Sequence, residues 1–271
     1  MSAFARQDGA RIGVFDSGVG GLTVLRALHE LLPEVGLDYI ADTAHAPYGE
    51  RGSEFIVERS LTLAGALIAD GARLVVVACN TATTQAIHAL RQRWPDLLFV
   101  GVEPGIKPAV QQTRNGRIGV MATRATLSSE RYRQLVAQHA GEARIFSQPC
   151  PGLADLIETA DLDSPAVLER IAQSCAPLSE AGVDTVLLGC THYPLVQAHI
   201  QARLGEHVQL LNIESAVARQ AARLWRHWRE AHPEEGVAQG IQLASTGDPL
   251  PLQRLAREAL GWPLEARQRK L

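Results

Sequence analysis

The chain has 271 residues, 46% of them apolar, and its net charge of −3 with a pI near 6.3 provides no basic surface for nucleic acid. No stretch approaches the roughly 18 apolar residues of a membrane span, and the N-terminal residues lack the apolar centre of a signal peptide. We therefore expect a soluble cytoplasmic protein whose partner is a small molecule, with no nucleic acid and no membrane.

Short apolar or β-branched runs alternate along the chain with helix-length stretches of spaced apolar residues, which predicts parallel α/β architecture. The predicted strands cover residues 11–16, 37–42, 72–79, 97–103, 116–123, 143–148, 184–190 and 208–213. Two of the intervening helices have clear ends, because residues 22–32 run into Pro33 and residues 56–71 stop at Gly71.

A short repeat divides the chain into two halves. The residues RIGV at 11–14 recur at 117–120, and a cysteine, Cys79 or Cys190, follows each copy at a similar distance at the end of a predicted strand. Open α/β sheets bind ligands beyond the carboxyl ends of their strands. The repeat thus predicts two similar α/β halves that enclose a cleft with a thiol on either wall.

The chain has four cysteines, Cys79, Cys150, Cys175 and Cys190. In a reducing cytoplasm, without paired CxxC spacing, they are expected to be free thiols and no metal site is predicted. Cys150 and Cys175 are interpreted as ordinary buried residues. Cys79 and Cys190 differ because polar residues follow each of them, and backbone N–H groups at a following helix start can hold a carboxylate.

Two loops between strand and helix add candidates. The segment DSGVGG starts at Asp16; it could be a plain helix cap and turn, or it could place Asp16 and Ser17 at the sheet edge to take an ammonium group and a carboxylate. Its glycines do not fit a dinucleotide-binding fingerprint. The segment PYGERG, from Pro47, is either a surface turn or a loop that presents Tyr48 and Gly49 to a ligand.

A cofactor is not expected either. Lys107 and Lys270 are the only lysines, whereas a pyridoxal phosphate enzyme needs a Schiff-base lysine. Glu158 and His192 are weaker candidates, since a lone carboxylate on a helix or a lone histidine after a strand is usually structural or solvated.

In order along nearly the whole chain, six segments resemble the glutamate racemase family of cofactor-independent aspartate and glutamate racemases: FDSGVGGLTV, DTAHAPYGE, ACNTAT, VGVEPGIKPA, ATRATLSSERY and GCTHYPL. The chain departs from the family's usual sequence at LNIESAVA, near its C-terminus. The resemblance implies interconversion of L- and D-glutamate without a cofactor, which supplies D-glutamate for peptidoglycan. It further implies one discontinuous domain of residues 1–100 and 212–271, and a second domain of residues 101–211 that is related to the first by a pseudo-twofold axis. A homodimer stays open as the assembly.

The resemblance also assigns the site. Cys79 and Cys190 match the catalytic cysteines, with Asp16 and His192 beside them and Glu158 as an auxiliary acid. The substrate-binding residues that it implies are Asp16, Ser17, Pro47, Tyr48, Gly49, Asn80, Thr81, Thr123, Thr126, Thr191 and His192.

The chemistry fits this pattern. Inversion of a chiral Cα needs a base on one face and an acid on the other, and two thiols on facing walls meet that need. The unperturbed pKa of cysteine, near 8.5, allows either role close to neutral pH.

Three other readings stay open on the sequence alone. A related two-cysteine racemase could act on aspartate. A thiol hydrolase could use Cys190 as nucleophile and His192 as base, although Cys79 would then have no role. A binding protein with two α/β lobes would hold an amino acid without turnover.

Overall fold

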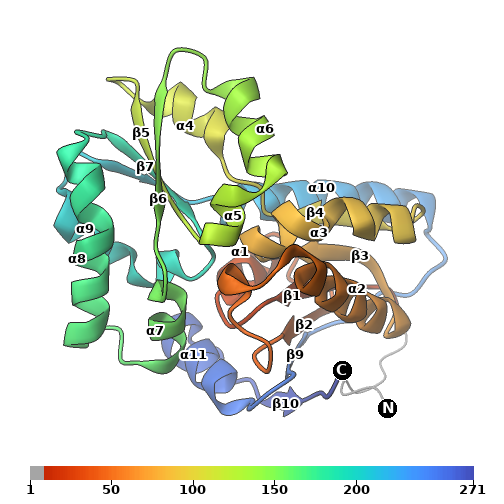
Figure 1. Cartoon of the computed structure of the whole chain (residues 1–271). Helices are drawn as coiled ribbons and strands as arrows, with labels where there is room; N and C mark the ends of the chain where they lie inside the picture. Colours follow the sequence, from red (N-terminus) through yellow and green to blue (C-terminus); the bar gives the residue numbers. More distant parts are fainter. Residues whose placement is uncertain (1–8) are drawn as a thin grey trace.

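A computed structural model describes residues 9–271, which form two open, fully parallel β-sheets flanked by helices (Figure 1). The first sheet has six strands in the order β10-β9-β2-β1-β3-β4. Its strands are β1 (Arg11–Asp16), β2 (Leu37–Ala41), β3 (Ala72–Val77), β4 (Leu98–Gly101), β9 (Ile241–Ser245) and β10 (Ala266–Gln268).

The second sheet has four strands in the order β6-β5-β7-β8. Its strands are β5 (Arg117–Ala122), β6 (Arg144–Pro149), β7 (Thr185–Gly189) and β8 (Gln209–Leu211). Strands β2-β1-β3-β4 of the first sheet correspond, strand for strand, to β6-β5-β7-β8 of the second. The predicted fold of two similar parallel α/β sheets is therefore confirmed. Cys79 follows β3 and Cys190 follows β7, which occupy equivalent places in the two sheets.

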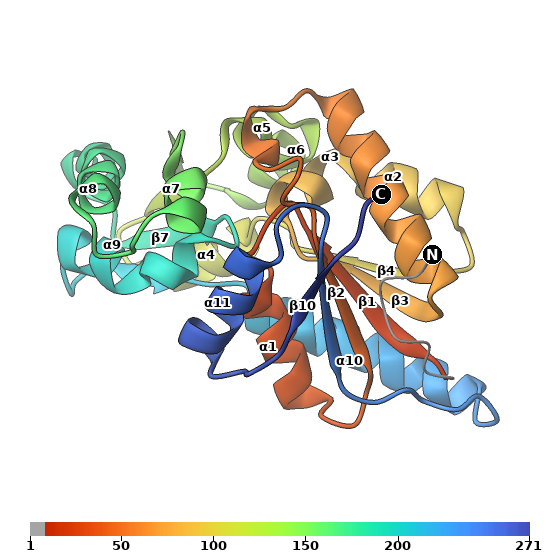
Figure 2. The same ribbon diagram turned by 90° about the horizontal axis from the view of Figure 1, so that it is seen from below.

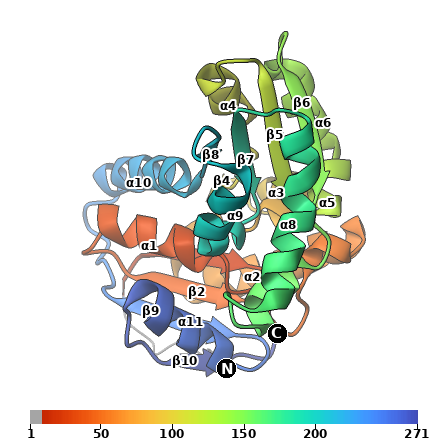
Figure 3. The ribbon, with the colours of Figure 1, turned by 90° about the vertical axis from the view of Figure 1, so that its left-hand side faces the viewer.

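Helices cover both faces of each sheet. Figure 2 shows α1 and α10 on one face of the first sheet, with α2 and α3 on the other. In Figure 3 the second sheet lies above the first, with α8 and α9 towards the viewer. The helices of the first sheet are α1 (Leu22–Leu31), α2 (Ser53–Ala69), α3 (Asn80–Arg93), α10 (Glu214–Ala231) and α11 (Leu250–Leu260), with the 3-10 turn η1 (Tyr48–Glu50). Those of the second are α4 (Ile106–Gln112), α5 (Arg124–Ser128), α6 (Glu130–His139), α7 (Leu153–Thr159), α8 (Pro165–Glu180) and α9 (Gln197–Leu204), with η2 (Tyr193–Val196).

Alternation along the strands builds the cores. Ile12 and Val14 of β1 pack on the α1 and α10 side, whereas Phe15 packs on the α2 and α3 side. The cluster that contains Ile12 continues into the second sheet through Ile118 and Val120, so one apolar core joins the two sheets. Burial of this shared core stabilises their arrangement.

The repeated RIGV segment has a packing reason. A Cβ on Gly13 would lie 2.9 Å from Leu67 of α2, and one on Gly119 would lie 3.0 Å from Leu178 of α8. Glycine at the same place in β1 and β5 thus lets a helix pack closely against the centre of each sheet.

All eight predicted strands are present, with ends that shift by a few residues. The strands β9 and β10 were not predicted; β10 has only three residues and lies at the sheet edge, where neither burial nor alternation marks it. Within residues 9–271 no helix is both long and apolar enough to cross a bilayer.

Candidate active site

The carboxyl ends of the two sheets meet around a small cavity of about 20 Å³, which is room for about one water molecule. Most of the predicted site residues line it. They are Ser17, Pro47, Tyr48, Gly49, Cys79, Asn80, Thr81, Thr123, Glu158, Cys190, Thr191 and His192, joined by Ala154, which the sequence did not indicate. Asp16 and Thr126, both fully buried, contact lining residues from behind.

Cys79 is the N-cap of α3, where its Sγ accepts a hydrogen bond from the backbone N–H of Ala82 at 3.4 Å. The Cys79 thiol also donates to the Ser17 hydroxyl over 3.6 Å. Burial, reinforced by the nearby carboxyl of Asp16, raises the pKa of Cys79 well above its usual range. Cys79 is therefore held as a protonated thiol at neutral pH, the form that can donate a proton.

Cys190 forms a chain with His192 and Glu158. The Sγ of Cys190 lies 3.6 Å from Nδ1 of His192, and Nε2 of His192 lies 2.6 Å from Oε1 of Glu158. Burial alone would lower the pKa of His192, but its hydrogen bonds to Cys190 and Glu158 outweigh burial and raise the pKa well above its usual range. An imidazolium at hydrogen-bond distance stabilises a thiolate, so this wall of the cavity suits a base.

Asp16 connects the two sheets. Its side chain at the end of β1 accepts hydrogen bonds from the Ser17 hydroxyl at 3.1 Å and from the Thr191 hydroxyl, beyond β7, at 2.9 Å. Burial raises the pKa of this carboxyl. Asp16 thus lies between the two cysteines' loops rather than serving as a simple helix cap, and Gly21 is the N-cap of α1.

The glycines of DSGVGG allow the second half of the chain to approach. A Cβ on Gly18 would lie 1.6 Å from Oε1 of Glu158, and one on Gly20 would lie 2.7 Å from Nδ1 of His192. The backbone N–H of Val19 donates to the same Glu158 oxygen at 3.1 Å. The backbone of this loop therefore packs directly against the hydrogen-bonded side chains of Glu158 and His192.

Three threonine hydroxyls hydrogen-bond to one another on the side of the cavity away from Glu158. Thr81 of α3 lies 2.9 Å from Thr123 and 3.2 Å from Thr126, and the latter two lie 3.0 Å apart. Thr123 is the N-cap of α5 and accepts from the backbone N–H of Thr126. The hydroxyls satisfy one another across the two halves and present donors and acceptors beside Cys79.

The loop after β2 has an anchor that the sequence analysis missed. The Tyr48 hydroxyl does not face a free cavity; it donates at 2.5 Å to Asp42, which also binds Arg59. Asp42 ends the predicted strand 37–42, and the rule that polar residues at strand ends form sites could have found it. Nothing in the sequence pattern indicates Arg59.

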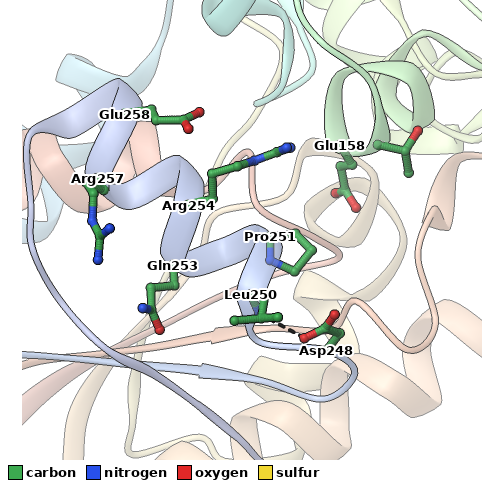
Figure 4. A pocket seen from close by; sticks show the side chains of 9 residues that line it. Glu158, Asp248, Leu250, Pro251, Gln253, Arg254, Arg257 and Glu258 are labelled. Carbon is green, nitrogen blue, oxygen red and sulfur yellow. Dashed lines mark hydrogen bonds between the residues drawn. The ribbon is translucent and has the colours of Figure 1, made fainter.

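A second, larger cavity of about 550 Å³ lies between α7 and α11. Figure 4 shows Arg254 of α11 extending towards Glu158 across this space. Glu158 lines both cavities, so its carboxylate separates the inner site from the outer surface.

The described residues also bear on metals and lysines. Among residues 9–271 no group of three or more His, Cys, Asp or Glu side chains could hold a metal ion. Lys107 lies in α4 and Lys270 is exposed near the C-terminus, and neither lines the inner cavity.

The sequence profile of the Asp/Glu/hydantoin racemase family matches residues 12–221. The chain belongs to this family. Its similarity to the family's glutamate racemases is high: the enzyme from Herpetosiphon aurantiacus is 47% identical over 239 residues, which cover 88% of this chain and 93% of the relative. The resemblance drawn from the six sequence segments is confirmed.

Solved structures of this racemase family agree with the fold. Glutamate racemase from Bacillus anthracis is 30% identical with a TM-score of 0.86, and the match covers 98% of this chain and 99% of the other. Escherichia coli glutamate racemase, in complex with L-glutamate and the activator UDP-MurNAc-ala, is 32% identical with a TM-score of 0.83 over 97% of this chain and 99% of that one.

Proposed function

We propose that this protein is a glutamate racemase that interconverts L- and D-glutamate by two-base proton transfer at Cα. The observation that carries the proposal is the placement of Cys79 and Cys190 after equivalent strands of the two sheets, on the wall of one cavity. The sequence similarity to glutamate racemases supports glutamate as the substrate.

In the proposed reaction the thiolate of one cysteine removes the Cα proton, and the thiol of the other donates its proton to the opposite face. Cys190, beside the protonated His192, acts on L-glutamate, and Cys79 acts on D-glutamate. After one turnover the two sulfurs have exchanged protonation states, so the reverse reaction resets them. Hydrogen-bond donors around the substrate carboxylate stabilise the carbanion that forms.

The other assigned residues complete the site. Asp16 and Ser17 bind the substrate's ammonium group and carboxylate, together with Asn80, Thr81 and Thr191. Glu158 keeps His192 protonated. The same proposal includes the formation of D-glutamate for peptidoglycan in the cytoplasm. Two further points stay predictions: the domain limits, 1–100 with 212–271 and 101–211, and a homodimer.

The test is incubation of the purified protein with L-glutamate in D2O. We expect loss of circular dichroism, with deuterium at Cα in the D-glutamate product before it enters the remaining L-glutamate, because a second base delivers solvent deuterium. L-aspartate and a simple ester are assayed in parallel. Faster racemisation of aspartate, turnover of the ester alone, or binding without turnover would overturn the assignment.

A further inference from the structure

The carboxylate of Asp42 is buried behind the inner cavity and has four side-chain partners. Arg59 donates to both of its oxygens, from Nε at 3.0 Å and from Nη2 at 2.9 Å. The Thr246 hydroxyl donates at 2.8 Å and the Tyr48 hydroxyl at 2.5 Å, while Nδ1 of His45 lies 3.0 Å away. Such a bidentate arginine contact fixes orientation as well as charge.

The partners come from three parts of the chain. Tyr48 belongs to the loop after β2, Arg59 to α2, and Thr246 follows β9, some 200 residues later in the sequence. Burial by itself would raise the pKa of Asp42, but the bonds from Arg59, Tyr48 and Thr246 outweigh burial and lower it. The group is therefore a carboxylate at neutral pH, with its lone pairs taken up by these donors.

Further hydrogen bonds join the same loop to the end of β9. The Thr246 hydroxyl accepts from the backbone N–H of Ala44 at 3.1 Å, and the Thr43 hydroxyl lies 2.5 Å from the Ser245 hydroxyl. The backbone N–H of Gly247 donates to Thr43 at 3.1 Å. The loop that leads to the cavity wall is thus held by a segment outside the cavity.

We propose that Asp42, Arg59 and Thr246 are positioning residues that hold the cavity wall formed by residues 47–49 in the geometry that binds substrate. Neither Arg59 nor Thr246 lines the cavity, so each acts through Asp42 and the Tyr48 hydroxyl. The inference rests on the proposed function, because it concerns how the same cavity binds glutamate.

Contacts on the opposite side of the wall make its position matter. A Cβ on Gly49 would lie 2.9 Å from Thr123, so the wall already touches Thr123 of the other half. If the Tyr48 hydroxyl lost its hydrogen bond to Asp42, the backbone of residues 47–49 could move relative to Cys79 and Thr81. A displacement of this kind weakens binding through lost alignment, even when every lining residue is intact.

The test compares Thr246→Val, which removes the hydroxyl at nearly constant volume, with Thr246→Ser, which keeps it. We expect Thr246→Val to raise KM for both enantiomers about tenfold, with a smaller change in kcat. A tenfold change corresponds to the free energy lost with one hydrogen bond to a charged group. Thr246→Ser should restore KM to within about twofold. Because the enantiomers have equal free energy, kcat/KM must fall by the same factor in both directions, which checks the assay.

The matched control is Thr113→Val, which removes a comparable hydroxyl bond of 2.6 Å to the carboxylate of Asp184, away from the cavity. It should lower the melting temperature without a change in KM. Tyr48→Phe combined with Thr246→Val should raise KM by less than the product of the single effects, since both act through Asp42.

An unchanged KM in folded Thr246→Val, or independent effects in the double variant, would overturn the positioning role alone. Absence of glutamate turnover by the wild type in the same assay would overturn the proposed function and this inference with it.

Discussion

At the scale of single residues, the two cavity cysteines differ in their surroundings. Cys79 contacts the hydroxyl of Ser17 and has the carboxyl of Asp16 nearby, whereas Cys190 contacts the imidazole of His192. This asymmetry supports the proposed mechanism, in which one wall supplies a proton donor and the other a base, as inversion at a single carbon requires.

Replacement of either cavity cysteine should strongly impair racemisation. Cys79→Ala and Cys190→Ala should each lower kcat by about 10²–10⁴-fold, the usual contribution of a positioned acid or base. The double variant should be little worse than either single one, because catalytic groups that act as a unit are not additive. Cys175→Ala, on the buried face of α8, is the control and should keep the wild-type rate. A cavity single variant with near wild-type turnover would contradict the two-thiol mechanism.

The raised pKa of Cys79 predicts how its alkylation depends on pH. Iodoacetamide reacts with the thiolate, whose fraction falls tenfold for each pH unit below the pKa. In the substrate-free protein the labelling rate of Cys79 should thus keep rising up to pH 10, without the levelling that an unshifted thiol shows near pH 9. Mass spectrometry of the tryptic peptide 74–91, in which Cys79 is the only cysteine, measures the rate. Low accessibility would slow labelling at every pH, but it would not move the pH at which the rate levels off.

At the scale of elements, the loop between β1 and α1 decides how closely the two halves meet. It has no side chain at positions 18 and 20, where Glu158 and His192 of the other half pack directly against its backbone. An added methyl group must displace the side chain of Glu158 at position 18, or the His192 side chain and the adjoining backbone of Thr191 and His192 at position 20.

Gly20→Ala should therefore lower kcat/KM by at least about tenfold, because overpacking of this size costs roughly 1–3 kcal/mol and moves His192 away from Cys190. The matched control is Gly52→Ala, where a Cβ meets nothing within 4 Å and φ is −69°. Steady-state kinetics and melting curves of both variants provide the measurement. Equal activity of the two variants would show that the close approach at residue 20 has no catalytic consequence.

At the scale of the whole molecule, two parallel sheets of the same strand order direct their carboxyl ends at one cavity and share one apolar core. The cavity, at about 20 Å³, is far smaller than the roughly 300 Å³ or more of a ligand pocket. Entry of glutamate must therefore enlarge the space between the halves.

We expect full activity without a metal or an organic cofactor. The residues around the cavity offer two thiols, an imidazole and two carboxyl groups, but no lysine for a Schiff base. Dialysis against EDTA, followed by hydroxylamine treatment to remove carbonyl cofactors, should leave the racemisation rate unchanged. A large loss of rate that a divalent metal or pyridoxal phosphate restores would contradict this expectation.

The sequence by itself determined the local features of this protein. Apolar runs of strand length, the RIGV repeat and the cysteine at the end of each half predicted two similar parallel sheets and the paired thiols, because period and strand-end position are local properties of the chain. The resemblance of six segments then indicated the family and the residues at positions such as 16, 48 and 123.

Only the tertiary structure decided which partners these residues have. The carboxylate of Glu158 reaches His192, Thr191 reaches Asp16, and Thr246 reaches Asp42 across separations that no local pattern encodes. The position of β9 is likewise not encoded locally, because β9 pairs with β2, a strand about 200 residues earlier in the sequence. Burial and the nearby Asp16 raise the pKa of Cys79, and the contact with Glu158 adds to that with Cys190 in raising the pKa of His192, so both values depend on groups that the fold brings together.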